Sequence, residues 1–117
     1  MGLAVAMEER DGLVVVSLSG ELDIYTVPGF RRDMGTVDPV STRIVVDLSD
    51  VTLLDSSGLG ALVSMLNRSH GGEGDLALVC PQRHLRRVFE VTGLREAFIF
   101  GDDVDSAIRA LDSTNST

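Results

Sequence analysis

Lysine and tryptophan are absent from the sequence, and cysteine occurs only once among the 117 residues, as Cys80. A single cysteine excludes an intramolecular disulfide, which fits a reducing compartment such as the cytoplasm. The chain opens without the charged and then apolar segment of a signal peptide, and no apolar run approaches the roughly 20 residues that span a bilayer. We therefore expect a cytoplasmic protein with no membrane segment. Because Cys80 follows an apolar run, we expect it to be a buried, small hydrophobic residue.

Basic residues are outnumbered: ten arginines stand against 18 acidic residues, and the formal net charge is −8. Because an acidic chain repels phosphate backbones, a protein with a basic surface is the expected partner, and nucleic acid is not. One cysteine and two separated histidines, His70 and His84, make no metal site. No phosphate-cradling glycine run that ends in Gly-Lys exists. The sequence thus indicates neither a metal nor a cofactor.

The apolar residues that are present, 44% of the chain, suffice for the core of one compact domain. We assign this domain to residues 1–112, followed by a polar, disordered tail over 113–117. Periodicity and turn residues predict secondary structure. Strands are expected at 3–7, 13–18, 43–48, 75–80 and 97–100, with a turn at 11–12. Helices are expected at 27–34, from about 56 to 69 with Gly71-Gly72 as its end, from Pro81 to just before Gly93, and over 104–111 after an Asp102 or Asp103 cap.

Strands and helices alternate after residue 43, which is typical of parallel strands joined by helical crossovers. The segments at 3–7 and 13–18 are instead close enough to form an antiparallel hairpin, and residues 20–23 are expected to leave the sheet. The predicted fold class is therefore α/β. It has a mixed sheet of about five strands with about four helices, an N-terminal hairpin being followed by parallel βα units.

The run Asp55-Ser56-Ser57-Gly58-Leu59-Gly60 lies between an extended segment and a helix, and it carries the chemistry. Ser56 is predicted at the first turn, where unpaired N–H groups and the positive end of the helix dipole favour a phosphate by about 0.3–1 kcal/mol. On spacing alone, the same residues also fit an ordinary helix N-cap whose glycines only permit tight packing. Both interpretations stay open at this point.

One face of the predicted helix is expected to point outward and to be almost without charge, so that a partner can pack closely on it. This face comprises Ser57, Ala61, Ser64, Met65 and Arg68. A phosphate on Ser56 would add roughly −1.5 to −2 charges beside Asp55, with Asp23 nearby if the loops converge. Repulsion and desolvation of about 3 kcal/mol would weaken a covering interface about 100-fold.

Three stretches resemble the STAS family, and specifically the bacterial anti-sigma-factor antagonists. They are Leu-Ser-Gly-Glu-Leu-Asp at 18–23, the segments 44–49 and 53–60, and the Leu-Val-Phe-Thr-Gly-Leu pattern within 85–94. Together they cover roughly residues 3 to 111. The Asp-Ser-Ser-Gly-Leu-Gly run after an apolar strand is the most specific of them. Residues 24–40, including Pro28 and Pro39, match no firm pattern of the family.

The resemblance implies a partner and a cycle. In the family, an anti-sigma factor with serine-kinase activity sequesters a sigma factor, and the unphosphorylated antagonist binds that kinase and frees the sigma factor. Phosphorylation with ATP releases the antagonist, and a metal-dependent serine phosphatase restores it. By position, Ser56 matches the phosphorylated serine, Asp55 the motif aspartate before it, Ser57 its neighbour, and Asp23 a loop acid that supports phosphorylation and partner contact.

The sequence and the resemblance together predict a binding module and not an enzyme. We expect it to be switched off by phosphorylation on Ser56. The expected partner contacts are Asp23, Asp55, Ser57, Gly58, Ala61, Ser64 and Met65. A STAS module in another signalling or transport-accessory complex is the nearest alternative.

Two further hypotheses belong to different classes of protein. A phosphorelay receiver would use Asp47 at the end of a buried strand, but it also needs a lysine, which this chain lacks. A serine hydrolase would pair Ser56 or Ser57 with a histidine, but the Gly-x-Ser-x-Gly elbow is absent. The histidines have ordinary interpretations: His70 as a solvated helix cap, and His84 on a surface helix face with Arg83, Arg86 and Arg87.

Overall fold

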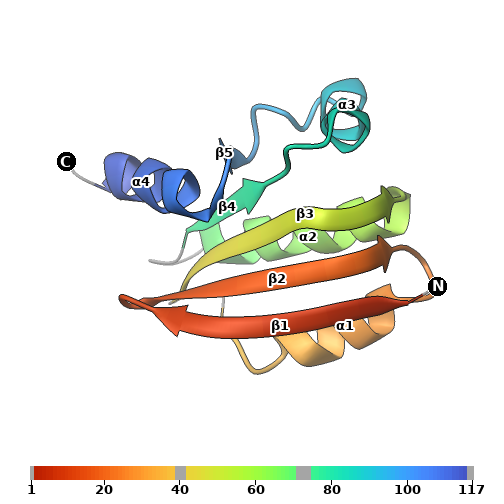
Figure 1. Cartoon of the computed structure of the whole chain (residues 1–117), viewed down its shortest axis with the longest axis horizontal. Helices are drawn as coiled ribbons and strands as arrows, with labels where there is room; N and C mark the ends of the chain where they lie inside the picture. The colour runs from red at the N-terminus through yellow and green to blue at the C-terminus, as the bar shows by residue number, and fades with distance from the viewer. Residues whose placement is uncertain (1, 39–41, 71–74, 116–117) are drawn as a thin grey trace.

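A computed structural model of the protein describes residues 2–38, 42–70 and 75–115, and within them five strands form one sheet in the chain order β1-β2-β3-β4-β5 (Figure 1). The strands are β1 Leu3–Arg10, β2 Leu13–Leu22, β3 Arg43–Leu54, β4 Leu76–Val79 and β5 Ile99–Gly101. The helices are α1 Val27–Met34, α2 Ser56–His70, α3 Arg83–Val91 and α4 Val104–Asn115. β1 is antiparallel to β2, and the other neighbouring strands are parallel. The predicted α/β fold is confirmed.

The helices divide between the two faces of the sheet. Right-handed crossovers that always step in the same direction place their helices on one face. The larger core accordingly joins α1, α2 and α3 to one face, with Phe30, Leu62 and Phe89 almost fully buried. α4, which follows the last strand, packs Ala107 and Leu111 on the other face in a separate cluster. The predicted strand and helix order therefore leads directly to an α/β sandwich of three layers.

The N-terminal hairpin turns through Asp11 and Gly12, as predicted. Both residues have positive φ, 51° and 82°, and the flanking Arg10 and Leu13 pair across the turn. A two-residue loop with positive φ at both positions matches the natural twist of the strands, and a glycine adopts that backbone without strain. The hairpin makes β1 an edge strand of the sheet.

β2 and β3 are longer than the sequence predicted. They stay paired through Leu22 and Leu54, beyond register shifts between Ser17 and Ser19 and between Gly20 and Glu21. The expectation that residues 20–23 leave the sheet is therefore wrong for 20–22. The side-chain amide of Gln82 stabilises the irregular stretch, because its Nε2 donates to the carbonyl oxygens of Leu48, Ser49 and Val51 at 2.7–2.9 Å.

α1 has the bounds predicted for it, and Val27, Phe30 and Met34 are its buried residues. Their spacing places them on one face of the helix. Pro28 lies in the first turn, where a missing N–H has no cost. Pro39 and the Gly71-Gly72 pair, two further features of the prediction, lie outside the described residues.

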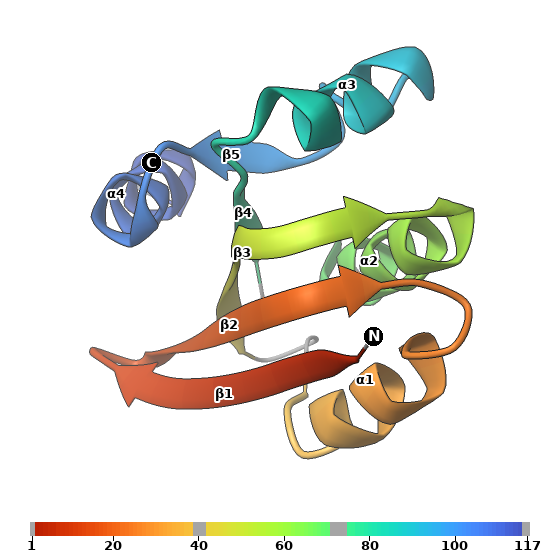
Figure 2. The same ribbon diagram turned by 45° about the vertical axis from the view of Figure 1, so that its right-hand side comes forward.

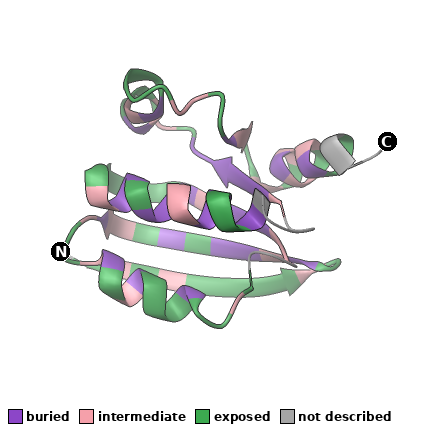
Figure 3. Ribbon diagram, turned by 180° about the vertical axis from the view of Figure 1, so that it is seen from behind, coloured by how far each residue is buried: buried purple, intermediate pink, exposed green. Residues whose placement is uncertain are grey.

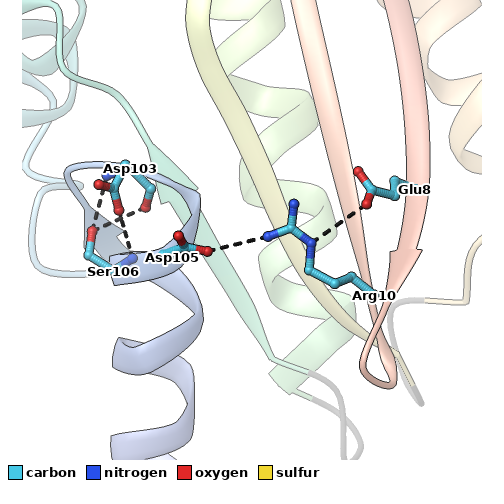
Figure 4. Close-up of polar contacts among 5 residues, drawn as sticks. All are labelled: Glu8, Arg10, Asp103, Asp105 and Ser106. Carbon is cyan, nitrogen blue, oxygen red and sulfur yellow. Dashed lines mark hydrogen bonds and ion pairs between the residues drawn. The ribbon is translucent and has the colours of Figure 1, made fainter.

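α4 begins after Asp103, in agreement with the predicted cap. Asp103 Oδ1 accepts the Ser106 N–H at 2.8 Å, and Ser106 Oγ accepts the Asp103 N–H at 3.0 Å (Figure 4). These bonds to Ser106 hold the pKa of the Asp103 carboxyl below its usual value. The helix continues to Asn115, and Asp112 pairs with Arg43 at 2.5 Å. Residues 113–115, predicted as a disordered tail, are therefore helical.

Candidate functional site

Ser56 is the first residue of α2, and its side chain is exposed. The residue before it, Asp55, caps the helix: its carbonyl oxygen accepts the Leu59 N–H at 2.9 Å, and its Oδ1 accepts the Gly58 N–H, also at 2.9 Å. The cap leaves the Ser56 hydroxyl at the positive end of the helix and open to another molecule. The positive end of a helix favours a negatively charged group at this position.

Asp55 also joins α2 to the loop that follows β2. Its second carboxylate oxygen, Oδ2, accepts the Ile24 N–H at 3.1 Å, and its own N–H donates to the Leu22 carbonyl oxygen at 3.3 Å. β2 and β3 are parallel, so the loop before α1 and the turn before α2 leave the sheet at the same end, as Figure 2 shows. The expected convergence of the loops around Ser56 is therefore present.

Asp23 organises the same loop. Its Oδ1 accepts the N–H groups of Tyr25 at 2.9 Å and Thr26 at 3.1 Å. The Thr26 hydroxyl accepts the Asp23 N–H at 3.0 Å and donates to the Glu21 carbonyl oxygen at 2.8 Å. Thr26 is the residue before α1, but its side chain makes no capping bond to that helix. Asp23 thus acts on the backbone that connects β2 to α1.

Three apolar side chains at this end of the sheet are exposed. Ile24 is 61% exposed, Tyr25 is 89% exposed, and Leu53, near the end of β3, is 41% exposed. Exposed apolar groups in neighbouring loops are typical of a contact surface. These three residues were not among the predicted partner contacts. The available signal was an apolar pair, Ile24-Tyr25, in a segment with no strand or helix pattern to bury it.

Three of the residues predicted as partner contacts are buried, and for Ala61 and Met65 the predicted outward-facing position is wrong. Two of these, Ala61 and Met65 of α2, are 2% and 7% exposed. They line a narrow groove of about 90 Å³ with Phe30 and Met34 of α1. Figure 3 shows α1 and α2 side by side on the same face of the sheet. The neighbouring helix therefore occupies the surface that the sequence had assigned to a partner.

Gly58 is the third buried position. A Cβ atom there would lie 2.4 Å from the Leu22 carbonyl oxygen and 2.9 Å from side-chain atoms of Leu22 and Leu54. The first turn of α2 consequently packs directly on the ends of β2 and β3. Gly58 has a structural role that brings Ser56 close to the Ile24 loop, and it offers no surface to a partner.

The solvent-exposed face of α2 is rotated about the helix axis relative to the predicted face. Its exposed residues are Ser56, Gly60, Asn67 and Arg68, with Ser64 half-buried between them. Ser57 is also half-buried. The first three turns of this face carry no charged side chain, so the expected uncharged character is retained on a different set of residues.

Asp47, which a phosphorelay receiver would use, and His84, which a serine hydrolase would use, both have structural partners. Asp47 lies inside β3 and not at its end, and its Oδ1 accepts the Ser49 N–H at 2.9 Å. His84 is exposed, with Nε2 3.2 Å from the Thr52 carbonyl oxygen, and the His70 side chain lies outside the described residues. Within 2–38, 42–70 and 75–115, no group of three or more His, Cys, Asp or Glu side chains could hold a metal ion.

Arg86 contacts the backbone of the buried Cys80, the residue that directly follows β4. Arg86 is half-buried, donates from Nε to the Cys80 carbonyl oxygen at 2.6 Å, and stacks on Phe100 at 5.5 Å from the ring centroid. The prediction that Arg86 belongs to a solvated face is wrong, because its guanidinium bonds to the Cys80 carbonyl oxygen and lies over the Phe100 ring. Cys80 is 0% exposed, as predicted, and burial raises the pKa of its thiol to about 11.

Comparison with known proteins defines the class. The STAS domain family model matches residues 4–107, so the chain belongs to the STAS domain family. An anti-sigma-B factor antagonist of Staphylococcus aureus (strain NCTC 8325 / PS 47) is 33% identical over 97 residues, which cover 82% of this chain and 90% of that protein. The Bacillus subtilis (strain 168) protein of the same name is 28% identical over 96 residues, 82% of this chain and 88% of its own.

A solved structure extends the similarity to three dimensions. The crystal structure of an anti-sigma factor antagonist from Mycobacterium paratuberculosis superposes with a TM-score of 0.78 at 32% identity, covering 94% of each chain. Among the described helices, none combines the length and apolar character needed to cross a membrane.

Proposed function

We propose that this protein is an anti-sigma-factor antagonist that acts in the cytoplasm as a binding module without catalysis. It binds an anti-sigma factor with serine-kinase activity and thereby frees a sigma factor. Phosphorylation of Ser56 by that kinase ends the binding, and a serine phosphatase restores it. The exposed Ser56 at the capped start of α2 carries the proposal, and the names of the similar proteins support it.

The proposed docking surface, which we call the switch surface, comprises the exposed residues around that serine. It includes Ile24, Tyr25, Leu53, Ser56 and Gly60, with Ser57 and Ser64 at its margin. The partner that fits it is the kinase itself, because phosphoryl transfer to Ser56 requires an active site to cover this serine. A partner with basic residues around an apolar contact would complement the net charge of −8.

The charge that phosphorylation adds explains how the switch would work. A phosphoserine brings roughly −1.5 to −2 charges to a surface whose centre is otherwise uncharged. Asp55 is adjacent and Asp23 lies in the neighbouring loop, so the new charge adds to an acidic environment. An interface that closes over it would have to desolvate the phosphate beside these carboxylates, which disfavours binding.

Incubation of the protein with candidate anti-sigma-factor kinases and ATP, followed by mass spectrometry, tests this function. We expect one phosphate per chain, on the peptide that contains Ser56, and release of the kinase once it is added. The Ser56→Ala variant provides the control for site specificity. Phosphorylation at another residue, or phosphorylation without release, would contradict the proposal.

A further inference from the structure

We infer that Asp55 is a positioning residue whose carboxylate fixes the Ile24–Tyr25 corner beside Ser56, so that a kinase meets the corner and the serine as one surface. The inference rests on the proposed function and assigns to Asp55 a role other than direct contact with the partner. One side chain joins two segments that are 31 residues apart in the sequence. Each carboxylate oxygen has its own amide, Gly58 N–H for Oδ1 and Ile24 N–H for Oδ2.

The corner is held by carboxylates at three successive amides. Ile24 N–H donates to Asp55, and Tyr25 N–H and Thr26 N–H donate to Asp23. The side chains of Ile24 and Tyr25 are nevertheless largely exposed to solvent, where they add little to the core. A fixed backbone that presents exposed apolar groups is preorganised for docking, because less conformational entropy remains to be lost when a partner binds.

Substitutions of Asp55 can remove its bond to the Ile24 N–H while keeping its cap on the Gly58 N–H. An asparagine has one acceptor oxygen, and its NH₂ group can only donate. In Asp55→Asn, the oxygen can still cap Gly58, whereas the NH₂ group would face the Ile24 N–H. Serine is also a good N-cap and is too short to serve both amides, so Asp55→Ser gives a second variant.

The chain offers a matched control in Asp103. It caps α4 through Oδ1 and the Ser106 N–H, on a helix that covers the opposite face of the sheet. Asp103→Asn removes the same charge at the same helix position and keeps the capping oxygen. A general effect of weakening a cap would appear in both variants, whereas an effect on the corner is confined to Asp55.

The test combines amide exchange with phosphorylation kinetics, using the kinase that phosphorylates Ser56. We expect Asp55→Asn and Asp55→Ser to speed exchange at the Ile24 amide about tenfold and to raise KM about tenfold, with kcat within about twofold of wild type. Asp103→Asn should change none of these quantities. The increase in KM should persist at about 0.5 M salt, where an effect of lost charge would be screened.

Several outcomes would overturn the inference. These are unchanged protection of the Ile24 amide, faster exchange without a change in KM, an equal response of Asp103→Asn, or an increase in KM that disappears at high salt. In each of these cases, phosphorylation of Ser56 in the wild-type protein still stands. If the wild-type protein is not phosphorylated at all, the proposed function fails, and this inference fails with it.

Discussion

Gly58 lies so close to Leu22 that a methyl group on its Cα would be 2.4 Å from the Leu22 carbonyl oxygen. We expect Gly58→Ala to lower the free energy of unfolding by about 2–3 kcal/mol, because backbone atoms cannot move aside as a flexible side chain can. Chemical denaturation measures the change. Gly60→Ala is the matched control. A Cβ atom there would meet no atom within 4 Å outside its own turn of α2, so this substitution should raise stability by about 0.5–1 kcal/mol through helix propensity alone.

Two Ser56 variants should separate the effect of a negative charge at this position from the effect of losing the hydroxyl group. Ser56→Ala should bind the kinase partner constitutively in the presence of ATP, because it cannot be phosphorylated. Ser56→Asp should bind about 100-fold more weakly, because it adds a negative charge beside Asp55. Calorimetry or surface plasmon resonance measures both. The same substitutions at Ser17 should leave binding unchanged, because by strand alternation this exposed residue of β2 shares the face of Leu13 and Val15, which pack on the side that α4 covers. Wild-type binding by both Ser56 variants would refute the switch assignment.

Tyr25 should contribute strongly to partner binding and very little to folding. Because its side chain is 89% exposed, Tyr25→Ala should change the free energy of unfolding by less than about 0.5 kcal/mol. Removal of an aromatic anchor from an interface should weaken kinase binding about 30-fold. Met7→Ala, which truncates another exposed apolar residue in the second half of β1, is the control. Equal effects of the two substitutions on binding would contradict the placement of the switch surface.

Cys80 should make stability depend on alkaline pH. Its thiol has a pKa of about 11 in the folded protein, above the ordinary value of 9.0. Between these values the unfolded chain releases a proton that the folded chain retains. The contribution of Cys80 is therefore fully present below pH 9 and is lost as the pH rises toward 11. Denaturation as a function of pH should show a steeper decline for wild type than for Cys80→Ala. Parallel curves would show that the thiol does not titrate in this way.

The elements that the sequence predicted well are those with a strong local signal. The Asp11-Gly12 turn has the residues that a tight hairpin requires, and Pro28 lies in the first turn of α1 as predicted, although the Thr26 side chain does not cap that helix. The position of Ser56 was predictable for the same reason, since Asp55 has the chemistry of an N-cap. Such features depend on a few neighbouring residues and need no knowledge of the tertiary structure.

The errors arise where distant segments determine the outcome. β2 and β3 continue past two register shifts, and those shifts break the alternation that would have revealed the longer strands. Gln82 supports the irregular part of β3 from more than thirty residues away, and no local pattern indicates that. Ala61 and Met65 were predicted to face outward because the packing of α1 against α2 cannot be deduced from either helix alone.

The order of the strands has a consequence for how the chain assembles during synthesis. Each strand pairs with the one made just before it, so no later strand has to insert between two earlier ones. Domains begin to form while translation proceeds, and short sequence separations between partners favour rapid folding. Every residue of the switch surface lies within the first 64 positions, so this region leaves the ribosome before β4, β5 and the helix that covers the second face have been synthesised.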